Sequence, residues 1–481
     1  MKKTIKRKTI YTILLAGIII VGLFLLYALS ELGNRSGTFF EDMADSEIFR
    51  AAAIFLLTIP VLLVLLIIKI LFPKKAEEQL YEDVESADWE ETSDEYEDVE
   101  SADWEETLDE YEEEQEQKTE APNERFCMLS AIDRNKEKYG HASYEKSVTP
   151  ESFCEDFRNF AASKLKLYYD IEDIRRFISG LAVSRLVILQ GMSGTGKTSL
   201  AHAFGAFTDN PATVIPVQPM WKERTDLIGY YNEFTKRFNE TLLLEKMYEA
   251  NYSRDMYVTV LDEMNIARVE YYFAEFLSLL ELPNPDERYI DVVSDKWDND
   301  PAQFKDGRLR LPENMWFIGT ANNDDSTFAI SDKVYDRAMI LNLDTKCERF
   351  AGVPTDRKPI SAAQFKELFE TARREYGVSR RNIKRLEEFD RYLIDHFHIT
   401  FGNRIMKQIR DYVAVYVSCG GTELFALDDI LAKKVIRKLE TQNPVYLRNA
   451  SEELLAFIDE LFGTDKMPLC KEYIKRLQRN A

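Results

Sequence analysis

Residues 186–205 read LVILQGMSGTGKTSLAHAFG, an apolar run followed by a glycine-rich loop and a stretch of helical composition. The loop, Gly191–Thr198, has the spacing G-x-x-x-x-G-K-[ST]. Its glycines allow a tight turn that points backbone N–H groups at phosphate oxygens, and the positive end of the next helix lies at the same place. The stretch therefore predicts a buried strand, a phosphate-binding loop and a helix.

The residues of this loop have different expected roles. Lys197 is expected to reach the β- and γ-phosphates of a nucleotide, and Thr198 to ligate Mg²⁺. A flexible loop without a ligand is the alternative that the motif alone leaves open. The expected nucleotide contacts are Gly191, Met192, Ser193, Gly194, Thr195, Gly196, Lys197, Thr198 and Ser199.

A second apolar run, residues 257–261, reads YVTVL and ends in two acids. At the tip of a strand, Asp262 suits a hold on Mg²⁺, and Glu263 suits a general base that polarises the attacking water. The alternative is a carboxylate pair that caps the following helix. With a phosphate loop upstream, we interpret the pair as catalytic.

Two more segments complete the pattern. The run MWFIGT at residues 315–320 predicts a third strand, and it leads into Asn322 and Asn323, whose amides suit the orientation of a water molecule beside the γ-phosphate. Asparagines are also ordinary turn residues. The stretch SDKVYDRAMIL at residues 331–341 predicts a short helix and a strand. Its Arg337 fits either a surface ion pair or a finger that reaches a neighbouring subunit's nucleotide.

In this order, the phosphate loop, LDEMNIAR (261–268), IGTANN (318–323) and residues 332–337 resemble the AAA+ superfamily. The closest resemblance is to the dynein-related group, which includes MoxR-type ATPases and the GTP-driven subunit of methylcytosine-specific restriction systems. It covers about residues 150–440. It implies an α/β fold, a parallel sheet flanked by helices, followed by an α-helical lid. It also implies ATP and Mg²⁺ as ligands, and a ring with a hexamer as the expected size.

The resemblance also implies roles for individual residues. Asn322 corresponds to the first sensor, ahead of Asn323, and Arg337 to the trans-acting finger. Members of the group often carry two or three arginines where this chain has Asp336-Arg337-Ala338. Arg404, near the start of a lid helix, corresponds to a second sensor at the γ-phosphate or is a surface residue. Trp221, Tyr230 and Tyr231 either touch a client or pack internally.

Other helices are predicted from apolar periodicity and start signals. One covers residues 151–164, with Thr149 and Pro150 at its start, and another covers residues 171–181. Toward the end of the chain we expect a lid helix at residues 426–440, a helix that starts at Ser451 and runs to 461, and one at residues 471–478. The five cysteines form no CxxC pair, which indicates reduced thiols rather than a disulfide framework.

Two uncharged apolar runs lie near the N-terminus, at residues 10–29 and 51–68, and the second predicted span extends to about residue 70. Each is long enough to cross a bilayer as a helix. Lysines and arginines precede the first run and lysines flank the end of the second, so both ends are expected in the cytoplasm. A cleaved signal peptide is the rival interpretation of the first run.

An acidic segment follows. The sequence YEDVESADWEET occurs at residues 81–92 and again at 96–107. Residues 76–120 contain one Lys and 23 Asp or Glu, a net of −22, which equals the net charge of the whole chain. Such a segment cannot bury enough apolar surface to fold, so we expect a disordered, extended tether. Docking of Trp89 and Trp104 on a basic partner is the alternative.

The predicted organisation is a transmembrane hairpin at 1–75, an acidic linker at 76–122, a nucleotide-binding core at 123–345 and a helical lid with further helices at 346–481. The predicted function is a membrane-anchored ATPase that remodels a protein client at the cytoplasmic face of the cell membrane. A nucleic-acid motor with a nuclease partner, driven by ATP or GTP, is the alternative. The nearly neutral folded part, with no excess of basic residues, argues against nucleic acid as a partner.

Overall fold

The computed structural model of the chain describes residues 124–140, 143–144, 148–322, 327–344 and 346–480. The predicted hairpin at 1–75, the acidic linker at 76–122 and Asn323 lie outside these residues. Among the helices that the structure does describe, none combines the length and the apolar character needed to cross a membrane.

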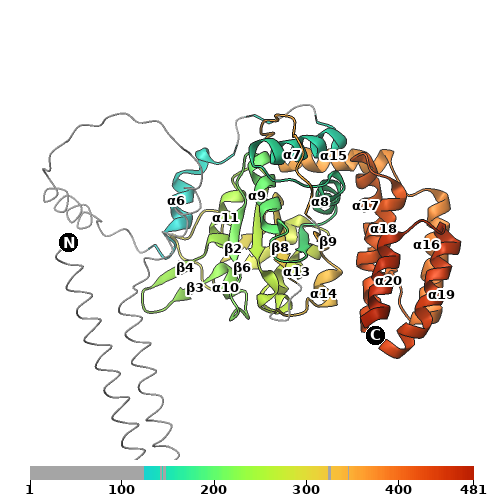
Figure 1. The fold of residues 1–481 in the computed structure, drawn as a ribbon. Helices are drawn as coiled ribbons and strands as arrows, with labels where there is room; N and C mark the ends of the chain where they lie inside the picture. Colours follow the sequence, from blue (N-terminus) through green and yellow to red (C-terminus); the bar gives the residue numbers. More distant parts are fainter. Residues whose placement is uncertain (1–123, 141–142, 145–147, 323–326, 345, 481) are drawn as a thin grey trace, which may run out of the picture. The chain divides into compact units, whose positions relative to one another are not determined.

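The centre of the fold is a parallel sheet of five strands in the order β2-β5-β8-β1-β9 (Figure 1). Two antiparallel hairpins, β3–β4 and β6–β7, lie outside this sheet. The strands are β1 (Leu186–Gln190), β2 (Thr213–Pro216), β3 (Gly229–Asn232), β4 (Arg237–Glu240), β5 (Tyr257–Asp262), β6 (Tyr289–Asp291), β7 (Arg308–Arg310), β8 (Met315–Ala321) and β9 (Met339–Asn342).

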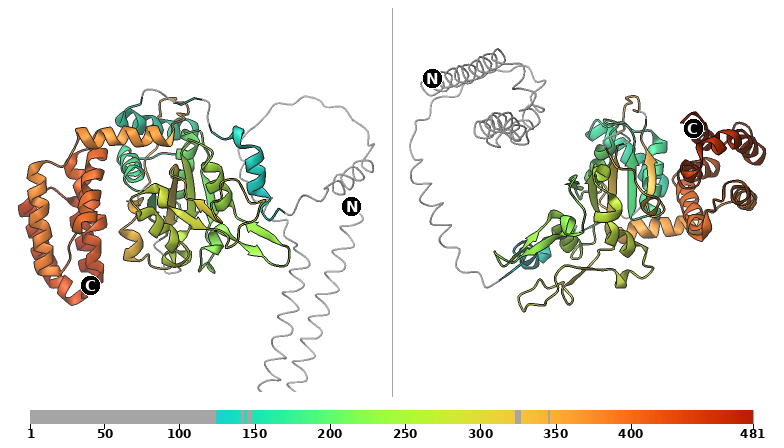
Figure 2. Two further views of the ribbon diagram at one scale, coloured as in Figure 1. Left: turned by 180° about the vertical axis from the view of Figure 1, so that it is seen from behind. Right: turned by 90° about the horizontal axis from the view of Figure 1, so that it is seen from below.

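Helices cover the sheet, and a helical bundle follows it (orange to red in Figure 2). The helices up to β9 are α6 (Met128–Arg134), α7 (Pro150–Lys164), α8 (Ile171–Val183), α9 (Lys197–Phe207), α10 (Thr225–Ile228), α11 (Leu242–Ala250), α12 (Val269–Tyr272), α13 (Ala274–Glu281) and α14 (Asp332–Tyr335). The later ones are α15 (Ala362–Glu375), α16 (Arg380–Phe397), α17 (Gly402–Ser418), α18 (Glu423–Lys434), the 3₁₀ turn η4 (Ile436–Thr441), α19 (Pro444–Phe462) and α20 (Pro468–Asn480).

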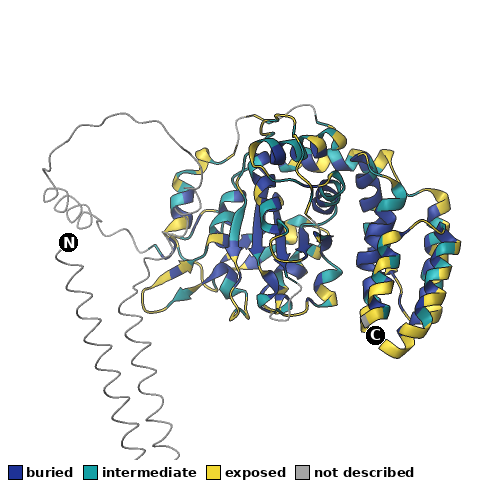
Figure 3. Cartoon of the chain, in the orientation of Figure 1, coloured by how far each residue is buried: buried dark blue, intermediate teal, exposed yellow. Residues whose placement is uncertain are grey.

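Both faces of the sheet are buried (Figure 3). Along β1, Val187 and Leu189 belong to one apolar core, and Leu186 and Ile188 belong to the other. This alternation follows from the two-residue period of a strand. A strand buried on both faces must be apolar throughout, which is why a continuous run such as LVIL predicts a central parallel strand.

Several predicted elements are confirmed. Strands β1, β5 and β8 begin at the predicted residues and extend one residue further than predicted. Helix α7 begins at Pro150, and Thr149 caps it by accepting a hydrogen bond from the backbone N–H of Ser152. The α/β core with a helical C-terminal part is therefore the fold of the described residues.

Two helix predictions near the C-terminus were wrong. Ser451 is not a helix start, because it is fully buried inside α19 and its hydroxyl donates to the carbonyl of Arg448. The helix begins instead at Pro444, where the Asn443 side chain accepts from the backbone N–H groups of the first turn. The single helix expected at 426–440 is α18, followed after Val435 by the 3₁₀ turn η4.

A buried charge cluster joins the bundle to the sheet domain. Asp429 on α18 is 1% exposed, and it accepts a hydrogen bond from the Tyr412 hydroxyl at 2.7 Å. Its carboxylate also pairs with Lys433 at 2.5 Å and with Arg176, on α8, at 3.5 Å. Burial lowers the pKa of Lys433, and the negative charge of Asp429 opposes that effect. The cluster is therefore a set of charges that depend on one another.

We predict that Asp429→Ala lowers the free energy of unfolding by about 3–5 kcal/mol, because it leaves the buried Lys433 ammonium group without its carboxylate and leaves Arg176 with Asp173 alone. Urea unfolding monitored by circular dichroism measures the change. The control is Asp395→Ala, which removes an exposed carboxylate from α16 and should change stability by less than about 0.5 kcal/mol. Equal stability of the two variants would contradict the prediction.

Candidate functional site

The carboxyl ends of three neighbouring strands meet at one edge of the sheet. Gln190, the last residue of β1, lies opposite Ala321 of β8, and Leu261 of β5 lies opposite Gly319. The loop after β1, the acids after β5 and the asparagine after β8 therefore leave the sheet side by side. A crevice beyond the carboxyl ends of strands is the usual ligand position in open α/β sheets.

The phosphate loop requires glycine at its first position. Gly191 has φ of 144°, and a Cβ there would lie 2.2 Å from the carbonyl oxygen of Leu343. This close approach arises because Leu343 donates its N–H to the carbonyl of Gln190, which continues the pairing of β9 with β1. The turn out of β1 is thus fixed by a neighbouring strand as well as by the loop's own sequence.

Lys197 begins α9 and is buried, with 7% of its surface exposed. Its ammonium group donates to the carbonyls of Gly191 at 3.0 Å and Met192 at 2.8 Å, so it lies inside the curve of the loop. The Tyr169 hydroxyl donates to the carbonyl of Gly196 at 3.1 Å, and burial raises the pKa of Tyr169. Met192, Ser193 and Gly194 are exposed, which leaves the loop accessible to a ligand.

Asp262, the last residue of β5, connects this strand with α9 and with β8. One of its oxygens, Oδ1, accepts hydrogen bonds from the hydroxyls of Thr198 and Thr320, both at 2.8 Å. The Thr320 hydroxyl also accepts a hydrogen bond from the backbone N–H of Glu263 at 2.8 Å. A hydroxyl both donates and accepts. Thr320 therefore positions both acids, although sequence reasoning did not single it out.

Glu263 occupies an unusual backbone conformation. Its φ of 51° and ψ of 45° are left-handed, a region that non-glycine residues visit rarely and that is concentrated at functional sites. The next residue, Met264, is fully buried against Gly319, where an added Cβ would lie 1.9 Å from the Met264 sulfur. The buried methionine anchors the turn, and the Glu263 side chain is exposed at the sheet edge.

The oxygen atoms of Thr198 and Asp262 suit Mg²⁺. They lie 2.8 Å apart, and Mg²⁺ binds oxygen ligands, usually one or two carboxylates completed by water and phosphate. No group of three His, Cys, Asp or Glu residues within the described part of the chain could hold a metal ion alone. These residues therefore fit a cation that arrives with a nucleotide.

Asn322 follows β8 directly, and its backbone is held from two sides. Its carbonyl accepts hydrogen bonds from the Asn265 side chain at 2.9 Å and from the Thr327 hydroxyl at 3.1 Å. Asn265, the asparagine of LDEMN, is 4% exposed. It connects the turn after β5 with the turn after β8. Asn265 is part of the motif LDEMNIAR, and this membership was the sequence feature that could have identified it. No role was assigned to it from the sequence.

The two arginines singled out in the sequence share one carboxylate. Arg337 donates to Glu281 Oε2 at 2.7 Å, and Arg404 pairs with Glu281 Oε1 at 2.7 Å. Arg404 thus lies with Arg337, at the end of α13. The structure records its ion pair there and records no hydrogen bond from it to residues 191–199, which are all described. The role of Arg404 as a second sensor stays a prediction.

Besides Arg404, cations of the C-terminal helical bundle line a cavity at the edge of the sheet. A cavity of about 500 Å³ contains Gln190 and Asn322 on one side, with Lys433, Arg437 and Arg476 from the bundle among its other lining residues. These three residues were not among the predicted site residues. In the sequence they lie in helical stretches of mixed apolar and charged residues and resemble ordinary helix residues, and only the packing of the bundle brings them to Asn322.

The aromatic residues proposed to face a client divide into two groups. Trp221 packs edge-on against Tyr272, with ring centroids 5.6 Å apart, and Tyr231 packs against Trp297 at 6.0 Å. Tyr230 is 52% exposed. The turn between β3 and β4 carries Phe234, which is fully exposed and was not predicted.

Comparison with known proteins identifies two regions of the chain. Residues 186–338 match the family model described as AAA domain (dynein-related subfamily). Residues 357–481 match a model described as a domain of unknown function (DUF8727). No curated protein matches the chain. Among solved structures, a candidate ATPase from Cytophaga hutchinsonii is 14% identical, with a TM-score of 0.39, and the match covers 68% of this chain and 88% of that one.

We predict that Thr320→Val lowers kcat for nucleotide hydrolysis by about 10- to 100-fold, because Asp262 and Glu263 lose the hydroxyl that orients them. Valine keeps the shape and the strand preference of threonine. Steady-state phosphate release and binding of a fluorescent nucleotide analogue separate this loss from a loss of affinity.

The matched control is Thr259→Val, which changes a threonine of β5 that is 1% exposed and takes no part in these hydrogen bonds. It should keep kcat within about 2-fold of the parent chain. A Thr320→Val variant as active as the Thr259→Val variant would contradict the role given to Thr320.

Proposed function

We propose that this chain, a P-loop ATPase whose residues 186–338 match the AAA domain (dynein-related subfamily), works as a membrane-anchored ring that remodels a protein client. The observation that carries the catalytic part of this proposal is the hydrogen-bonded series Thr198, Asp262, Thr320 and Glu263. It joins the metal-binding and water-activating positions to the helix that follows the phosphate loop.

The roles of the site residues follow from their chemistry. The loop N–H groups and the Lys197 ammonium group bind the phosphates, and Thr198 and Asp262 would hold Mg²⁺, which would supply positive charge to neutralise the phosphates. Glu263 accepts the proton of the attacking water, and the Asn322 amide orients that water. Lys197 gives up its hydrogen bonds to the loop carbonyls when phosphate oxygens take their place.

The proposal of a ring rests on the predicted role of Arg337 as an arginine finger. An arginine finger stabilises transition-state charge on a neighbour's nucleotide, so it acts only in an assembly. In the single chain Arg337 pairs with Glu281, and the two side chains are 25% and 28% exposed. Ion pairs at such partly exposed positions are worth roughly 0–1 kcal/mol. A neighbouring triphosphate, with several negative charges, is a stronger partner for the guanidinium group.

Client remodelling is supported by the exposed apolar side chains of the β3–β4 region. Phe234 is 100% exposed and Met220 is 80% exposed, and Tyr230 lies between them in the sequence. Phe234 and Tyr230 lie on the β3–β4 hairpin and Met220 precedes it; exposed apolar groups of this size have no role in the core of the single chain, and they suit contact with a partner protein. The nearly neutral folded part favours a protein over a nucleic acid as that partner.

Membrane anchoring is proposed from the sequence of residues 1–75. Two uncharged runs of spanning length with basic residues outside them give a hairpin with both ends in the cytoplasm. The acidic segment 76–122 then acts as an extended tether between the membrane and the ATPase.

For the ATPase, we predict that Glu263→Gln lowers kcat at least about 100-fold while ATP still binds, since the general base is lost but the phosphate loop remains. Lys197→Ala should abolish binding instead. Phosphate release by the full chain in detergent, with ATP and with GTP and at several protein concentrations, measures both variants and reveals any need for assembly.

The control for this experiment is Glu387→Gln on α16, which neutralises an exposed acid far along the chain from the site. It should be as active as the parent. A Glu263→Gln variant with parental kcat would refute the catalytic assignment. Stimulation by double-stranded DNA would favour a nucleic-acid motor over a protein remodeller.

For the anchor, we predict that the full chain stays in the membrane pellet after alkaline carbonate extraction and is released only by detergent. A chain lacking residues 1–75 should be found in the supernatant, because it has lost both apolar runs. A chain lacking only residues 76–122 is the matched control and should remain in the pellet. Extraction of the full chain by carbonate alone would disprove the anchor.

A further inference from the structure

The short segment that carries Arg337 has little secondary structure of its own. Helix α14 has four residues, and β9 begins at Met339, so residues 336–338 form the connection between them. Within this connection the backbone N–H groups donate back to Asp332 and Val334. The carbonyls of Tyr335, Asp336 and Ala338 point away from these bonds and need donors from elsewhere, as at the end of any helix.

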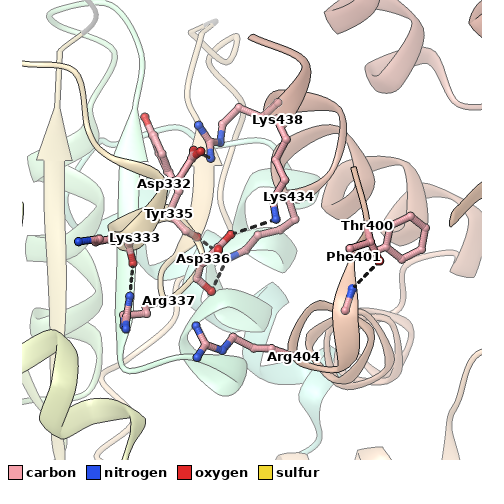
Figure 4. A network of polar contacts seen from close by, with 12 residues as sticks. Asp332, Lys333, Tyr335, Asp336, Arg337, Thr400, Phe401, Arg404, Lys434 and Lys438 are labelled. Carbon is pink, nitrogen blue, oxygen red and sulfur yellow. Dashed lines mark hydrogen bonds and ion pairs between the residues drawn. The ribbon is translucent and has the colours of Figure 1, made fainter. Parts of the chain in front are cut away.

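One residue of α18 in the helical bundle, Lys434, donates to all three carbonyls. The Lys434 ammonium group donates to the carbonyl of Tyr335 at 2.6 Å and also to the carbonyls of Asp336 and Ala338 (Figure 4). An ammonium group has three N–H bonds, so this set uses all of them. The three carbonyls lie on both sides of Arg337 in the sequence. Lys434 is 2% exposed, so water cannot replace these bonds.

Other residues of the bundle also hold the segment 332–338. They contact the side chains of this segment and one of its backbone carbonyls. Arg437 pairs with Asp332 at 2.5 Å and lies over the Tyr335 ring at 3.9 Å. Lys438 pairs with Asp336 at 3.6 Å, and the Gln408 side chain donates to the carbonyl of Asp336 at 3.2 Å. The position of Arg337 is therefore tied to α17, α18 and η4 rather than to the sheet alone.

The same lid elements face the catalytic edge on their other side. Lys433 precedes Lys434 in α18, and it lines the cavity that contains Asn322, together with Arg437. Negative charge brought into this cavity would attract these two cations. A change in their position would be passed to the Arg337 segment, because Lys433 shares α18 with Lys434 and Arg437, in η4, itself pairs with Asp332.

We propose that Lys434 is a positioning residue that holds Arg337 for use by a neighbouring subunit, so that the lid of one subunit sets the finger for the nucleotide of the next. This inference rests on the ring arrangement in the proposed function. Lys434 does not touch nucleotide in its own subunit, so its effect should appear only in the subunit that lends the finger.

Mixed assemblies of the full chain test this directly. Subunits with Arg337→Ala keep a complete catalytic edge but lend no finger, and subunits with Glu263→Gln lend a finger but do not hydrolyse. Each should be inactive alone, and a mixture should recover ATPase activity. With Lys434→Met added to the Glu263→Gln subunit, the recovered kcat should fall at least about 10-fold with KM unchanged, since small misplacements of a catalytic group cost this much.

With Lys434→Met added to the Arg337→Ala subunit instead, the recovered activity should stay within about 2-fold, because that subunit's finger is already absent. The matched control is Lys475→Met, an exposed lysine of α20, which should have no effect in either subunit. Mass photometry of each mixture verifies that assembly is unchanged. The proposal would be overturned if Lys434→Met lowered the recovered kcat equally in either subunit. It would also be overturned if Lys434→Met in the Glu263→Gln subunit, which lends the finger, did not lower the recovered kcat.

If the two parental variants recover no activity when mixed, the trans-acting finger of the proposed function fails, and this inference fails with it. If they do recover and the Lys434→Met placement has no effect, only the inference fails. Should Lys434→Met prevent folding, Gln408→Leu removes one of the other bonds to the same segment. It should show the same dependence on placement with a smaller loss, about 3-fold.

Discussion

One carboxylate, that of Asp262, holds together the polar ends of the central strands. It accepts hydrogen bonds from a hydroxyl at the start of α9 and from a hydroxyl at the end of β8, while it ends β5 itself. Three elements distant in the sequence thus meet at one oxygen. The geometry is possible because parallel neighbouring strands end at the same edge of a sheet. The turn at Glu263 and the oxygen pair of Thr198 and Asp262 both depend on it.

The close packing around this edge explains the small residues that surround it. A side chain at Gly191 would meet the carbonyl of Leu343, and one at Gly319 would meet the Met264 sulfur. Both contacts come from neighbouring strands or turns, so they bring the loop and the acids into a fixed relation. The left-handed backbone of Glu263 is held in the same way, by its N–H bond to Thr320 and by the buried Met264.

The lid contributes in two directions. Its buried cluster around Asp429 fastens it to α8, and its Lys434 and Arg437 hold the segment of Arg337. The residues between these contacts line the cavity that contains Asn322. A bundle fixed at both points contacts both the sheet edge that ends in Asn322 and the segment that carries Arg337. The match of residues 357–481 to a separate family model indicates that this bundle is a recurrent unit.

Sequence alone determined the central strands, the phosphate loop and the order of the polar strand ends, because these depend on local patterns: uninterrupted apolar runs, glycine spacing and charged residues at strand tips. It also predicted the start of α7 from Thr149 and Pro150, but it misplaced a helix start at Ser451 because Asn443 and Pro444 form the stronger cap. Only the tertiary structure decided that Thr320 and Asn265 connect the strand ends, that Arg404 lies with Arg337 on Glu281, and that Lys434 holds the Arg337 segment. Each of these contacts joins residues at least about 50 positions apart in the chain, and no local periodicity or motif spacing encodes which distant side chain will fill a given site.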